Sequence, residues 1–221
     1  MASYGATGAA GIRSDDFSLG SLDTWWTTKT EGTATTAFEG NNTINFTIPN
    51  DQNYDWSGIG NFTYYGVEQA VTIGLDFEIE ASWTQWGGSS WEICGIGVYD
   101  GTRGESTRVG CYANGANLEI FGNTTDSPNF GSATITLPTT ELKLRLKWVE
   151  GTTTVSGQYK ADGGAWTNLG SGQVWAAQPD FCVLYSGRSG ASTGWTSKAD
   201  YFWETSAPIT GGPPPRRVMV R

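Results

Sequence analysis

The sequence contains no histidine, only three cysteines and two methionines, and charged residues make up just 16% of its 221 positions. Without histidine a Ser-His-Asp triad is impossible, and so is any metal site with histidine ligands. The cysteines show no Cys-x-x-Cys spacing, and no glycine-rich run has the spacing of a phosphate-binding loop. These absences argue against nucleotide chemistry and against catalytic centres built on histidine or zinc.

Long apolar segments are also absent. No stretch of ten or more residues keeps a 3.6-residue apolar period, and none approaches the roughly 20 apolar residues that span a membrane. The first residues lack the basic and apolar regions of a secretory signal. We therefore expect a protein made in the cytoplasm, with a secreted protein whose signal has been removed as the alternative.

The sequence is instead rich in residues typical of strands and tight turns, with 31 glycines, 11 tryptophans and many threonines. Between Val71 and Trp83 seven apolar residues alternate strictly with polar ones, and Leu142 to Trp148 repeat the pattern. About a dozen short strands with frequent turn signals predict an all-β, two-sheet antiparallel jelly-roll sandwich. We place this domain at residues 14–206, between an N-terminal arm (1–13) and a C-terminal segment (207–221).

The C-terminal segment differs from the rest in charge. Three of the 13 basic residues, Arg216, Arg217 and Arg221, follow a Gly-Gly-Pro-Pro-Pro spacer. The remaining chain has ten basic and 22 acidic residues, so it should repel nucleic acid and anionic membranes. We expect an extended spacer and a basic arm that docks on acidic patches of a neighbouring subunit.

Two stretches resemble the concanavalin A-like lectin and glucanase superfamily, including its laminin-G-like domains. One is the pair of strands at 142–148 and 152–160 followed by Asp-Gly-Gly-Ala-Trp at 162–166, and the other is the opening Asp-Asp-Phe at 15–17 with Leu-Asp-Thr-Trp at 22–25. The resemblance covers about residues 14 to 205. It implies the sandwich fold but not one function, because this fold serves lectins, glycosidases and spacers alike.

Three carboxylates, Asp76, Glu78 and Glu80, share one face of the predicted strand at 71–83. Glucanases of this fold place their catalytic acids in a Glu-x-Asp-x-Glu strand, but here the order is Asp, Glu, Glu. The outer two Cα atoms would be about 13 Å apart, and retaining hydrolysis needs carboxyl groups about 5 Å apart, which the short Asp76 side chain disfavours. The alternative is a charge ladder with Lys143, Arg145 and Lys147.

Aromatic side chains in loops are candidates for stacking on sugar rings. We select Tyr54, Trp56, Trp86 and Trp195 as carbohydrate-binding candidates, although most tryptophans of such a sandwich fill its core. Calcium is the one cofactor left open, with oxygen ligands from Asp51, Asp55, Asp100 and Glu105; otherwise no metal or cofactor is expected. Cys94 and Cys111 flank a hairpin and should lie opposite each other, either as buried thiols or as a cross-strand disulfide.

These observations predict a non-catalytic virion surface protein, either a capsid decoration or a tail appendage. Its partners would be other virion proteins or its own copies, bound through the terminal arms, and its loops would hold host glycans in one version of this hypothesis. The alternatives are a secreted carbohydrate-binding module and a glucanase-type glycan hydrolase that uses Asp76, Glu78 and Glu80.

Overall fold

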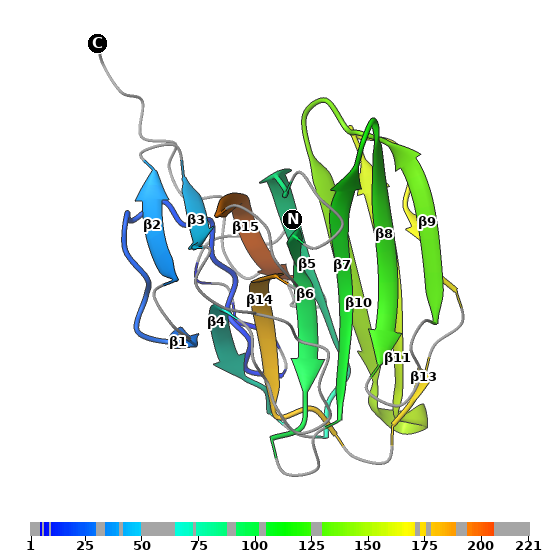
Figure 1. Cartoon of the computed structure of the whole chain (residues 1–221). Helices are drawn as coiled ribbons and strands as arrows, with labels where there is room; N and C mark the ends of the chain where they lie inside the picture. Colours follow the sequence, from blue (N-terminus) through cyan, green and yellow to red (C-terminus); the bar gives the residue numbers. More distant parts are fainter. Residues whose placement is uncertain are drawn as a thin grey trace.

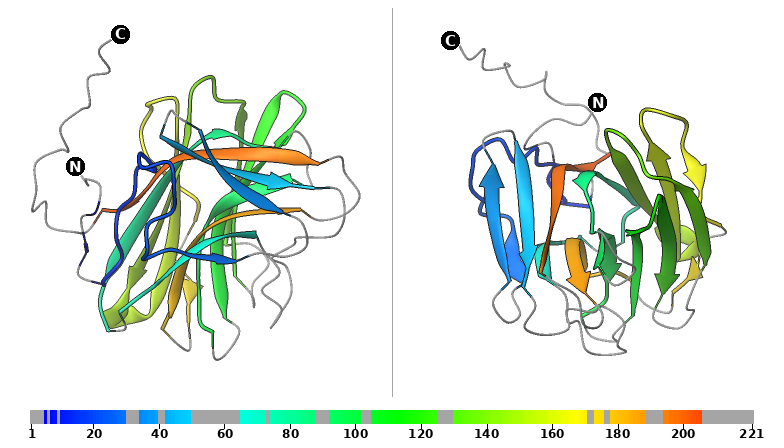
Figure 2. Two further views of the ribbon diagram at one scale, coloured as in Figure 1. Left: turned by 90° about the vertical axis from the view of Figure 1, so that its left-hand side faces the viewer. Right: turned by 45° about the horizontal axis from the view of Figure 1, so that its top comes forward.

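The computed structural model describes residues 5, 7–8, 10–29, 34–39, 42–49, 65–72, 74–87, 92–101, 105–124, 130–170, 173–175, 178–188 and 194–205. These residues form two antiparallel sheets that lie face to face in two layers (Figures 1 and 2), which confirms the predicted sandwich. Among them, no helix is long and apolar enough to cross a membrane.

The first sheet has seven strands in the order β1-β4-β14-β6-β7-β8-β9. Their bounds are β1 Thr27–Lys29, β4 Tyr65–Ala70, β14 Phe181–Arg188, β6 Glu92–Tyr99, β7 Ser106–Asn114, β8 Asn117–Thr124 and β9 Gly131–Thr136.

The second sheet has eight strands: the order β12-β11-β10-β5-β15-β3-β2, plus β13, which pairs with β11. Their bounds are β12 Thr167–Asn168, β11 Thr154–Ala161, β10 Leu142–Val149, β5 Phe77–Gln85, β15 Trp195–Glu204, β3 Thr43–Ile48, β2 Thr35–Glu39 and β13 Gln173–Val174. The 3-10 turn Glu150–Thr152 links β10 to β11.

The core lies between the sheets and follows the alternation of the sequence. On β5 the side chains of Phe77, Ile79, Ala81 and Trp83 are each at most 1% exposed, and the apolar residues of β10 face them from the neighbouring strand. Burying whole aromatic side chains such as Trp83 contributes about 1.5–3 kcal/mol each. This alternation makes the sheet stable and turns the polar residues of both strands outward.

The strand expected from Val71 to Trp83 is shorter in the structure. Gly74 adopts a φ of 89°, which L-residues rarely populate, and β5 begins only at Phe77. Leu75 is 38% exposed as a result. Periodicity alone could not show this break, because a turn glycine at an even position leaves the alternation intact.

The N-terminal segment packs into the sandwich rather than extending from it. Ala10 and Ile12 are fully buried, and Asp15 exchanges two backbone hydrogen bonds with Phe202 of β15, at 2.8 and 2.9 Å. The Asp15 carboxylate accepts hydrogen bonds from the Phe17 backbone N–H and the Trp26 indole N–H, both at 2.7 Å. Ala10 and Ile12, which lie within the predicted arm at 1–13, thus belong to the hydrophobic core.

This buried carboxylate should make stability depend on pH. Burial raises the pKa of Asp15 above its ordinary value of 3.8, against the opposing effect of its two hydrogen bonds. The stability that this group contributes is therefore fully present below that ordinary value and is lost as pH rises through the raised pKa. We expect the stability difference between the wild type and Asp15→Asn to fall as pH rises through this window. Melting temperatures of both proteins from about pH 3 to 7 test it; a constant difference would contradict it.

Candidate functional site

The outer face of the seven-stranded sheet carries a row of positions without side chains. Gly95 of β6 lies directly opposite Gly110 of β7, and Gly97 shares this face by alternation. A Cβ on Gly110 would come within 2.4 Å of the Tyr185 hydroxyl and 2.8 Å of the Phe121 ring. These glycines therefore allow aromatic side chains of β14 and β8 to lie across the neighbouring strands.

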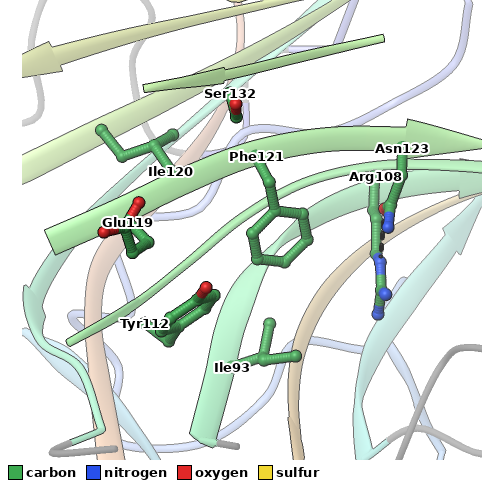
Figure 3. A pocket seen from close by; sticks show the side chains of 8 residues that line it. All are labelled: Ile93, Arg108, Tyr112, Glu119, Ile120, Phe121, Asn123 and Ser132. Atoms are coloured by element: carbon green, nitrogen blue, oxygen red, sulfur yellow. Dashed lines mark hydrogen bonds between the residues drawn. The ribbon is translucent and has the colours of Figure 1, made fainter. Parts of the chain in front are cut away.

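Beside this glycine row lies a groove with a volume of about 360 Å³, formed by β6, β7, β8 and β9 (Figure 3). Phe121 lies at its centre, and the ring of Tyr112 lies beside it with centroids 6.1 Å apart and an interplanar angle of 40°. The residues that line the groove are Ile93, Arg108, Tyr112, Glu119, Ile120, Phe121, Asn123 and Ser132.

Polar groups lie at both ends of the groove. At one end the Arg108 Nε donates to the Asn123 amide oxygen at 2.7 Å, and the guanidinium lies 5.3 Å from the centroid of the Phe121 ring. At the other end Tyr112 is directly opposite Glu119, whose carboxylate accepts a hydrogen bond from Thr134 at 2.7 Å. Partial burial, and then the Glu119 charge, raise the pKa of the Tyr112 hydroxyl, which therefore stays protonated. Aromatic faces with polar groups at each end suit a ligand that is apolar on its faces and polar at its rim.

The three predicted carboxylates lie on the outer face of the other sheet or just before it. Asp76 precedes β5 and accepts a hydrogen bond from the Glu150 backbone N–H at 2.7 Å. Glu78 and Glu80 lie opposite Lys147 and Arg145 of β10, which confirms two rungs of the predicted charge ladder. The third cation, Lys143, lies opposite Ser82 and pairs with Glu141 at 3.2 Å instead. Arg145 contacts both glutamates, at 3.3 and 2.8 Å, and the Tyr201 hydroxyl donates to Glu80 at 2.5 Å.

Of the four aromatic candidates, the structure describes Trp86 and Trp195, and neither lines the groove. Trp195 was expected in a loop, but it begins β15, is only 8% exposed and belongs to the core, so its ring has no face to offer a sugar. Trp86 is half-buried and packs against the core. Tyr54 and Trp56 lie outside the described residues.

The remaining predictions concern the arms and calcium. Arg216, Arg217 and Arg221 lie outside the described residues, as do Asp51 and Asp55. Asp100 and Glu105 belong to one hairpin turn, in which the Asp100 N–H donates to the Glu105 carbonyl at 2.9 Å. Within the described ranges, no three acidic or cysteine side chains gather as a metal site would require.

The groove residues themselves were missed from the sequence, although a signal was present. On β7 and β8 the outward residues Arg108, Tyr112, Glu119, Phe121 and Asn123 alternate with buried apolar or small ones. Aromatic and polar residues at alternate positions, beside strands whose outward positions are glycine, mark a binding face. The stacking candidates selected from the sequence lie in predicted loops, whereas the groove is formed by strands.

The fold belongs to the class of two-sheet antiparallel β-sandwiches. No family model and no curated protein matches the sequence. Solved structures match it at low identity. They include the GH43 BlXynB protein from Bacillus licheniformis (TM-score 0.66, 13% identity) and a xylan β-1,4-xylosidase from Bacillus halodurans C-125 (0.64, 14%), and each match covers 86% of this chain and 38% of that protein.

An endo-1,3-β-glucanase from Streptomyces sioyaensis is similar over nearly its whole length, with a TM-score of 0.53, 14% identity, and coverage of 86% of this chain and 94% of that one. The chain thus spans less than half of the first two proteins but almost all of the glucanase. At these identities the similarity establishes the fold.

These comparisons correct two predictions. The expected non-catalytic virion protein is wrong, because the similar structures come from glycoside hydrolases, and nothing in them supports a capsid or tail role. The expectation that the chain is not an enzyme is wrong for the same reason. It rested on the absence of histidine and on the order of the acids at 76–80, and neither excludes hydrolysis by carboxylates placed elsewhere.

Proposed function

We propose that this chain takes part in the breakdown of β-linked polysaccharide and binds the glycan in the groove around Phe121. The observation that carries the proposal is the pair of adjacent rings, Tyr112 and Phe121, with hydrogen-bonding side chains at both ends of the same groove. Similar sandwiches occur in a xylosidase and a glucanase, which suggests xylan and β-1,3-glucan as the first ligands to test.

The chemistry of the groove matches that of a sugar chain. A pyranose ring presents C–H groups on its faces, which pack against aromatic rings, and hydroxyls around its edge, which need hydrogen-bond partners. Phe121 and Tyr112 supply the rings, and Glu119, Asn123 and Ser132 supply acceptors and donors within one groove.

Glu119 is the carboxylate of the groove that could act in hydrolysis. Glycoside hydrolysis uses two carboxyl groups, about 5 Å apart for retention and about 6.5–9.5 Å apart for inversion. Among the described lining residues, only Glu119 carries one. The described lining of the groove therefore supplies one carboxyl group of such a pair.

Replacing Phe121 with alanine should weaken glycan binding about tenfold, because loss of an aromatic stacking surface costs about 1.4 kcal/mol. Phe121→Tyr keeps the ring and should retain binding. Isothermal titration with xylo-oligosaccharides and with β-1,3-gluco-oligosaccharides measures the affinities. Phe38→Ala is the matched control, since Phe38 is a half-buried phenylalanine of β2 in the other sheet and should leave affinity unchanged.

Hydrolysis is measured on the same proteins from the reducing ends released from xylan and laminarin. If Glu119 acts in the reaction, Glu119→Gln abolishes that release and leaves the fold intact. Absence of binding to both oligosaccharide series, together with absence of hydrolysis, would refute the proposed function. Equal affinity of wild type and Phe121→Ala would place the binding site elsewhere on the molecule.

A further inference from the structure

Two cysteines lie face to face beneath the groove. Cys94 of β6 and Cys111 of β7 are directly opposite each other in the antiparallel register, and their sulfur atoms are 3.6 Å apart. Both side chains are fully buried between the sheets, and both are free thiols. They are neighbours of the Gly95 and Gly110 pair, which faces the opposite way, toward the groove.

The backbone already satisfies the main requirement for a disulfide. Opposite residues of an antiparallel pair have Cα atoms about 4.5–5.5 Å apart, within the range of about 4.4–6.8 Å that disulfides span. The two side chains point to the same face, so side-chain rotation suffices to bring the sulfur atoms into bonding distance.

The third cysteine has no comparable partner. Cys182 of β14 lies opposite Val98, four residues along β6 from Cys94 and therefore about 13 Å from it along the strand. Its sulfur lies 3.7 Å from the Gln69 carbonyl oxygen. Geometry therefore selects one pairing out of three.

We propose that Cys94 and Cys111 form a cross-strand disulfide when the protein folds in the presence of a small-molecule disulfide such as oxidised glutathione. One cysteine thiolate attacks oxidised glutathione, which gives a mixed disulfide and releases one glutathione thiolate. The second cysteine thiolate attacks the protein sulfur of that mixed disulfide and releases the second glutathione. The protein loses two protons and two electrons. The oxidised glutathione gains them and becomes two molecules of reduced glutathione.

The bond forms while the strands are pairing. Burial raises the pKa of the Cys94 thiol well above its ordinary value, so the closed sandwich keeps this group protonated and unreactive. Once formed, the disulfide cross-links β6 to β7 beside the glycine pair and constrains the segment between residues 94 and 111. The chain-entropy model for a loop of this length predicts a rise in melting temperature of roughly 6–12 °C.

The test compares the full chain refolded with oxidised glutathione and with a thiol reductant. The unfolded products are alkylated without reduction, weighed by mass spectrometry and digested. We expect one alkylated cysteine, Cys182, after oxidative refolding and three after reductive refolding, with a Cys94 to Cys111 cross-linked peptide in the oxidised digest. The oxidised form should melt at the higher temperature.

Variants assign the bond. Cys182→Ala should still form the disulfide, whereas Cys94→Ala and Cys111→Ala should each leave two alkylated cysteines after oxidative refolding. Three alkylated cysteines in the oxidised wild type, a cross-link that includes Cys182, or dimers joined through cysteine would each overturn the proposal. The thiol count does not depend on glycan binding, so the result stands apart from the proposed function.

Discussion

Replacing Gly131 with alanine should cost about 3 kcal/mol or more of unfolding free energy, or prevent folding altogether. A Cβ built on Gly131 would lie 0.9 Å from the Leu169 carbonyl oxygen and 2.1 Å from its carbon. These are backbone atoms, so the clash cannot be relieved by turning a side chain. One of the two segments would have to move.

Neither segment moves freely, because both are attached to the edges of the sandwich. Gly131 begins β9, which is an edge strand of the seven-stranded sheet. Leu169 directly follows β12, which is an edge strand of the other sheet. The Leu169 N–H donates to the Gly157 carbonyl at 3.0 Å. The two sheet edges therefore meet backbone against backbone at this point and close the side of the core.

Chemical denaturation of Gly131→Ala and wild type measures the effect. Gly151→Ala is the matched control, since a Cβ there meets no atom within 4 Å, and its stability should stay within about 0.5 kcal/mol of wild type. A Gly131→Ala protein as stable as the control would show that the sheet edges separate without cost. The close approach would then play no part in closing the core.

The difference between these two glycines shows where sequence reasoning stops. A hairpin joins residues that are near in sequence, so the turn between Cys94 and Cys111 predicted that they lie opposite each other, which the structure confirms. Gly131 and Leu169 are 38 positions apart, and their contact depends on how the two sheets stack. The residues around Gly131 and around Gly151 do not show which of the two glycines lies against a backbone carbonyl and which has no atom near it.

The same limit applied to the candidate site. The sequence predicted about a dozen short strands, but the groove also requires that β6, β7, β8 and β9 lie side by side in that order. Strand order is a long-range property, set by packing of both sheets. The pairing of β5 with β10 was likewise left open by the sequence, although the signs of the charges on their outer faces favoured it.

The pairing of β5 with β10 leads to a second prediction with a large effect on stability. Arg145→Ala should destabilise the protein by about 2–3 kcal/mol, because it removes the shared cation of Glu78 and Glu80. The Glu80 side chain is only 9% exposed, so water compensates poorly for the lost charge. The guanidinium also lies 3.9 Å from the centroid of the Trp166 ring, a contact that alanine cannot replace.

Arg145→Lys separates these contributions. Lysine keeps the charge, but its single ammonium cannot bridge two carboxylates and stack on Trp166 together, so about half of the loss should remain. Lys147→Ala is the control on the same strand and face. Lys147 is exposed and lies opposite Glu78, and its removal should cost less than about 0.5 kcal/mol. Equal losses for Arg145→Ala and Lys147→Ala, measured by denaturant unfolding, would mean that the bridged glutamates act only as a solvated charged surface.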